Sequence, residues 1–143
     1  GRLLTGLLID RIHAPLVASV FFVGGAIGVF LLRGAHDYTA LLVAATLIGL
    51  TIGAEGDLIS YLVRSYFGLT SFGSLFGIAF SGYGLGAVIG PIGLGAWFDR
   101  HGSYDLPLLV LPCMLLASAA LVLSLGRYRM GADLRDVTAP ASA

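Results

Sequence analysis

Four long apolar segments separated by short polar ones dominate the pattern of this chain. Three of them, residues 13–32, 65–98 and 106–126, carry no acidic residue, arginine or lysine. The fourth runs from Tyr38 to Val63 and is interrupted only by Glu55 and Asp57. A predominantly apolar stretch of about 18 residues or more can cross a bilayer as a helix. The pattern therefore predicts an all-α, polytopic membrane protein with four spans, at residues 14–32, 38–63, 72–98 and 106–125.

The segments outside the spans are polar and short. No stretch alternates polar and apolar residues, so no β-strand is predicted. We expect residues 1–13 to be the end of a preceding helix and a loop, residues 14–128 a membrane domain, and residues 129–143 a disordered tail. The chain opens with Gly1 and has no signal-peptide pattern, which favours a truncated protein whose missing part lies upstream.

Composition agrees with a membrane protein. Hydrophobic residues make up 57% of the chain and charged residues 11%, whereas soluble domains carry about 25% charged residues. The net charge is zero and no basic tract is present, so a nucleic-acid partner is not expected. One cysteine, three dispersed histidines and the absence of known catalytic motifs predict no disulfide, metal, cofactor or enzyme activity.

The arginines predict the orientation in the membrane. Cytoplasmic segments carry the excess of basic residues. If the chain starts inside, the inside segments hold six arginines and the outside loops hold Arg33 and Arg100. We therefore expect a multi-pass protein of the cell (inner) membrane with both ends in the cytoplasm, and the lipid bilayer as its surroundings.

Glu55 and Asp57 are the candidate functional residues, because an acidic group at the centre of a span costs about 2.5–3.5 kcal/mol on insertion scales. At 100° per residue they lie about 200° apart on a helix. Asp57 shares its face with Tyr61 and Arg64, which favours a structural or gating interaction. Glu55 shares its face with Thr51, and burial there favours its protonated form. Glu55 is therefore a candidate for proton coupling, the alternative being a structural hydrogen bond to a neighbouring helix.

Three sequence elements together resemble the major facilitator superfamily. The first is G-x-L-x-D-R, with Gly6, Asp10 and Arg11, which is similar to the cytoplasmic loop motif of that family, although the basic pair that usually follows is absent. The second, with Gly82, Gly86, Gly90 and Pro91, resembles the glycine- and proline-rich helix of that family. The third, from Glu55 through Tyr61 and Arg64 to residue 77, resembles helix ten of bacterial monocarboxylate or oxalate/formate-type members.

The resemblance implies that the spans are helices nine to twelve of a twelve-helix transporter. It implies a secondary active transporter that moves a small solute, such as an organic anion, by alternating access with proton symport or exchange. The missing N-terminal part of the same transporter would be a partner. Span two would line the substrate path, and the loop motif would stabilise one conformation of the cycle.

Each of these elements has an alternative interpretation. Asp10 and Arg11 can simply cap a helix and anchor it at the headgroups, and glycines four residues apart can serve static packing instead of gating. The chain can also be part of an oligomeric channel, or of a non-transporting membrane scaffold. A channel needs a ring of polar residues from several copies, and a scaffold has no need of a buried acid.

Overall fold

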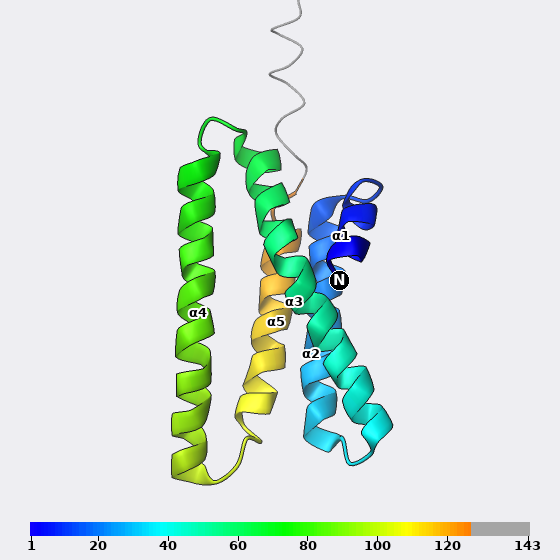
Figure 1. The fold of residues 1–143 in the computed structure, drawn as a ribbon, viewed down its shortest axis with the longest axis vertical. Helices are drawn as coiled ribbons and strands as arrows, with labels where there is room; N and C mark the ends of the chain where they lie inside the picture. Colours follow the sequence, from blue (N-terminus) through cyan, green and yellow to red (C-terminus); the bar gives the residue numbers. More distant parts are fainter. Residues whose placement is uncertain (127–143) are drawn as a thin grey trace, which may run out of the picture.

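The protein is all-helical over the part that the structure, a computed structural model, describes, which is residues 1–126 (Figure 1). No strand occurs in this part of the chain. The expected tail at residues 129–143 lies outside the described residues. The helices are α1 (Arg2–Ile9), α2 (Ala14–Gly34), α3 (Tyr38–Phe67), α4 (Phe72–His101) and α5 (Pro107–Leu123).

Three of these helices are long and apolar enough to cross a membrane. α2 has 21 residues, and α3 and α4 have 30 each. At 1.5 Å per residue these lengths are about 32 Å and about 45 Å, against a hydrocarbon core of about 30 Å. α5 is also apolar but has 17 residues, or about 26 Å. The predicted all-helical fold is therefore confirmed for the described residues, and three of its helices are fit to cross a membrane by length and composition. A fourth crossing by α5 stays a prediction.

Helix α2 packs against α3 on one side and α5 on the other. Small residues on α2 make this close packing possible, because they let neighbouring backbones approach. A Cβ atom added to Gly28 would lie 3.0 Å from the Ala44 carbonyl oxygen of α3. On the α5 side, the buried Ser19 hydroxyl donates to the Ala119 carbonyl at 3.3 Å. The core contains Ala14, Val17 and Ala18 of α2 with Ala54 and Leu58 of α3 and Ile9 of α1.

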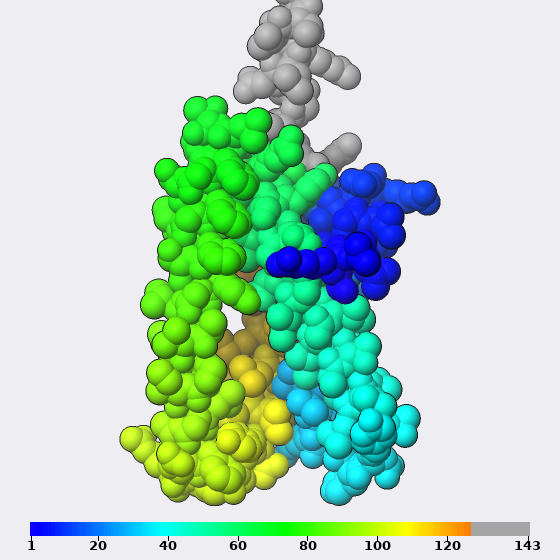
Figure 2. Space-filling model, viewed as in Figure 1, coloured from blue at the N-terminus to red at the C-terminus, as the bar shows by residue number. Residues whose placement is uncertain are grey.

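Helix α4 stands apart from this core. None of its residues is buried, and Figure 2 shows an opening between α4 and α5, although α4 touches α3 near the turn that joins them. A cavity of about 360 Å³ lies between α4 and α5, lined by Gly90, Gly93 and Trp97 of α4 together with apolar residues of α5. The four spans expected from the sequence therefore do not form one compact bundle over the described residues.

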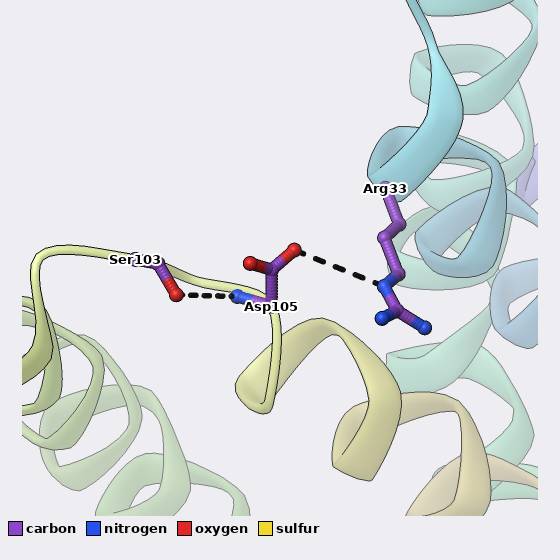
Figure 3. A network of polar contacts seen from close by, with 3 residues as sticks. All are labelled: Arg33, Ser103 and Asp105. Carbon is purple, nitrogen blue, oxygen red and sulfur yellow. Dashed lines mark hydrogen bonds and ion pairs between the residues drawn. The ribbon is translucent and has the colours of Figure 1, made fainter.

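The turns gather at two opposite ends of the molecule. The α1–α2 and α3–α4 turns lie at one end, and the α2–α3 and α4–α5 turns lie at the other (Figure 1). At the first end the Tyr66 hydroxyl donates to the Gly126 carbonyl. At the second end Arg33 Nε lies 3.8 Å from Asp105 Oδ1, and the Asp105 N–H donates to Ser103 Oγ at 3.4 Å (Figure 3). The chain thus reverses direction at each turn, as successive spans require.

Candidate functional site

Glu55 lies on α3 at the edge of a cavity of about 120 Å³ between α2, α3 and α5. The cavity is lined on α3 by Thr51 and Glu55, one helical turn apart, and is otherwise apolar. Its apolar lining consists of Phe22, Gly25 and Val29 from α2, Ile48 and Ile52 from α3, and Leu115 from α5. The Glu55 side chain, which is half-buried, thus faces the inside of the helix bundle.

Thr51 fixes the distance between α2 and α3 beside this cavity. Its hydroxyl donates to the Phe21 carbonyl of α2 at 2.8 Å, and the Leu47 carbonyl of its own helix lies 3.0 Å away. Gly25 makes the contact possible, because a Cβ there would lie 2.7 Å from Thr51 Oγ1. Since Oγ1 has a single proton, engaged with backbone carbonyls, it presents only an acceptor to the cavity.

The Glu55 carboxyl has no partner among residues 1–126. No described side chain forms an ion pair or hydrogen bond with it, and the cavity provides no donor. A carboxylate that is partly removed from water without a donor is disfavoured, and binding of a proton or a small cation offsets that cost. The geometry therefore makes Glu55 a candidate for binding one positive charge.

Asp57, Tyr61 and Arg64 lie on a different face of α3. The helix is continuous from Tyr38 to Phe67, so the positions i, i+4 and i+7 fall on one side, as the spacing predicts. Tyr61 packs against the core, whereas the Arg64 side chain is exposed. Within the described part of the chain Asp57 and Arg64 do not form an ion pair. The structure thus separates Glu55 from the second acidic residue.

Arg2 is a residue that the sequence reasoning counted only as a cytoplasmic charge. Its guanidinium Nη2 lies 4.0 Å from the position of a Cβ on Gly56, and its backbone nitrogen is 3.6 Å from the corresponding position on Gly53. Arg2 is therefore placed against the middle of α3, on the face away from Glu55. The available signal was that Arg2 begins a mostly apolar eight-residue helix, since an arginine beside apolar residues needs a polar environment.

The loop-motif residues lie at one end of the molecule. Gly6 is in α1, Asp10 is the C-cap residue of that helix, and Arg11 follows it. Asp10 and Arg11 are exposed and form no ion pair within residues 1–126. Their expected role as a contact of one transport conformation stays a prediction.

The glycines of α4 are not in close contact with another helix among the described residues. No atom outside their own helix backbone lies within 4 Å of a Cβ placed on Gly82, Gly86 or Gly90. Pro91 lies inside α4, which continues uninterrupted to His101. Their packing or gating role therefore stays a prediction. Among residues 1–126 it is Gly25 and Gly28 of α2, which the sequence alone did not single out, that pack closely against α3.

The described residues contain no group of three or more histidine, cysteine, aspartate or glutamate side chains that could hold a metal ion. Comparison with known proteins adds no assignment: no family model, no curated protein and no solved structure matches the chain. The resemblance to the major facilitator superfamily therefore rests on the sequence elements alone.

Proposed function

We propose that this chain is part of a secondary active transporter of the major facilitator type, which moves a small solute across the membrane by alternating access. Glu55 is the coupling residue of this proposal. The observation that carries it is the half-buried Glu55 carboxyl, without a partner among residues 1–126, at a cavity between α2, α3 and α5. Intramembrane acids in such positions serve ion and proton pathways.

The arrangement supports exchange of a proton at this site. No charged side chain from α2 or α5 lines the cavity. Arg2 of α1 lies against Gly53 and Gly56, and Asp57 lies on another face of α3 than Glu55. The charge of Glu55 is therefore not neutralised locally, and gain or loss of one proton changes the net charge of the cavity. A conformational equilibrium can be shifted by such a change if its two states differ in their access to water.

The proposal includes four crossings, with α5 as the fourth and both ends in the cytoplasm. The described turns alternate between two ends of the molecule, which supports such a path. At 17 residues, α5 lies at the lower limit for a spanning helix. Helices from the remainder of the transporter would pack against the open side of α4.

Uptake by the complete protein that contains these residues tests the proposal. It is reconstituted in liposomes, and uptake of radiolabelled formate, lactate, oxalate and propylammonium is measured with and without an imposed pH gradient. We expect protein-dependent uptake of at least one solute that the gradient drives above equilibrium, relative to empty vesicles. A steady ohmic conductance in planar bilayers would instead indicate a channel, and neither uptake nor conductance would favour a scaffold.

A further inference from the structure

The cavity beside Glu55 has the chemistry of a site for a cation. Its polar groups are one carboxyl, from Glu55, and one hydroxyl, from Thr51, whose proton is engaged with the Phe21 carbonyl at 2.8 Å. Both groups can accept hydrogen bonds from a ligand, and an ionised Glu55 carboxylate has no proton to donate. A ligand that donates several hydrogen bonds and carries one positive charge would satisfy both.

An anion does not fit the same cavity. None of its lining residues is basic, and the Arg64 side chain is exposed at the end of α3. Arg2 lies against Gly53 and Gly56, on another face of that helix. An anion in the cavity would therefore meet either the Glu55 carboxylate or, once Glu55 is protonated, a single donor, and in both cases no cation balances its charge at low dielectric.

The size and lining of the cavity restrict the cation further. A volume of about 120 Å³ is close to the roughly 150 Å³ of an apolar cavity that holds one benzene molecule, so the ligand is a small molecule. The rest of the wall is apolar, with Val29, Ile48 and Leu115 among its side chains. A hydrated inorganic ion would leave this apolar wall against water, whereas a short alkyl chain would bury it.

We propose that this cavity binds a short primary alkylammonium ion, with its ammonium group on the Glu55 carboxylate and Thr51 Oγ1 and its alkyl chain against Val29, Ile48 and Leu115. The ammonium group has three donors, and the pairing neutralises the single negative charge of the site. As a transported solute this ion depends on the transporter function proposed above, whereas its binding depends only on the cavity.

Calorimetric titration of the complete, purified protein with propylammonium chloride tests the binding, with sodium butyrate as the ligand of similar size and opposite charge. We expect propylammonium to bind and butyrate not to bind. Glu55→Gln should weaken propylammonium binding at least about 30-fold, because it removes the charge partner. Thr51→Val should weaken it about three- to tenfold, because it removes one acceptor.

Matched variants on the same helix control for general effects on folding. Asp37→Asn removes an acid at the N-cap of α3, and Thr46→Val removes an exposed hydroxyl that bonds only to the Leu42 carbonyl of its own helix. Both should leave the affinity unchanged. A loss of binding in these variants equal to that in Glu55→Gln and Thr51→Val would overturn the assignment to this cavity.

A change in ligand preference keeps the test decisive if Glu55→Gln does not fold. Leu115→Ala shortens one side chain of the apolar wall and so enlarges the cavity. It should shift the best ligand from propylammonium to a longer alkylammonium, an effect that loss of stability alone would not produce. An unchanged chain-length preference would contradict the proposal, as would binding of butyrate in place of propylammonium. If propylammonium does not bind but a carboxylate is transported with protons, the cation site is wrong and the transporter function stands. If propylammonium binds and no solute is transported, the cation site stands and the transporter function is wrong.

Discussion

Gly25 of α2 and Thr51 of α3 are in direct contact, and their contact sets the separation of the two helices beside Glu55. A Cβ on Gly25 would lie 2.7 Å from Thr51 Oγ1, 3.0 Å from Cγ2 and 3.2 Å from Cβ. Threonine is branched at Cβ, so rotation about its χ1 exchanges one of these atoms for another without making room. The hydroxyl also bonds to the Phe21 carbonyl across the interface, which leaves it no alternative position at equal cost.

Gly25→Ala should therefore destabilise the protein by about 1–3 kcal/mol, since overpacking a well-packed contact forces a shift of the helices. The measurement is thermal unfolding of the purified protein in detergent. Gly24→Ala is the control on the neighbouring position, where an added Cβ would lie 4.0 Å from Leu47 Cδ2 in ordinary contact. This control should be neutral or slightly stabilising, because alanine favours helix over glycine. Equal destabilisation by both variants would show that α2 and α3 are not this close.

The helices could be predicted from the sequence because each depends on its own residues. Uninterrupted apolar runs specify α2 and α4, which begin at Ala14 and Phe72. The placement of Glu55 and Asp57 on different faces of α3 follows from helical periodicity alone. The helix ends are less well determined. α4 extends to His101 because Gly102 follows it with φ of +67°, a conformation that favours glycine as a helix C-cap.

The contacts between helices could not be predicted in the same way, because they depend on which faces meet. Gly82, Gly86 and Gly90 have the more conspicuous spacing, yet the glycines that pack closely among residues 1–126 include Gly25 and Gly28. Nothing in the local sequence says that α3 lies against that face of α2. Similarly, no local pattern shows that Glu55 faces a cavity shared with α2 and α5.

The proposed topology predicts which side of the membrane each turn faces. With Cys113 replaced by serine, single cysteines are introduced at Ala35, Ser71 and Ser103. Ala35 is the C-cap residue of α2, Ser71 is the N-cap residue of α4, and Ser103 lies in the turn between α4 and α5. A membrane-impermeant thiol reagent added outside intact cells should modify positions 35 and 103 and spare position 71. The same reagent should reach position 71 in inverted vesicles. Modification of position 71 from outside intact cells would reverse the orientation.

The ion pair between Arg33 and Asp105 should contribute little to stability. Its atoms are 3.8 Å apart and the side chains are 44% and 71% exposed, so water and salt screen the attraction. In a double-mutant cycle with Arg33→Gln and Asp105→Asn, we expect a coupling below about 1 kcal/mol that falls further in high salt. A salt-independent coupling above about 3 kcal/mol would mean that this end of the molecule is shielded from water in the membrane.

The last prediction concerns the step that Glu55 is proposed to perform. Glutamine is nearly isosteric with a protonated glutamate and carries no charge, so Glu55→Gln holds the site in one charge state. Exchange of labelled for unlabelled solute needs no net proton movement and should persist at lower affinity, whereas accumulation driven by a pH gradient should be lost. Asp37→Asn, at the N-cap of α3, should preserve both activities. The experiment compares counterflow and gradient-driven uptake in the same batch of proteoliposomes made from the complete protein. If Glu55→Gln accumulates solute as well as the parent protein does, Glu55 has a packing role, and the coupling proton is bound elsewhere in the transporter.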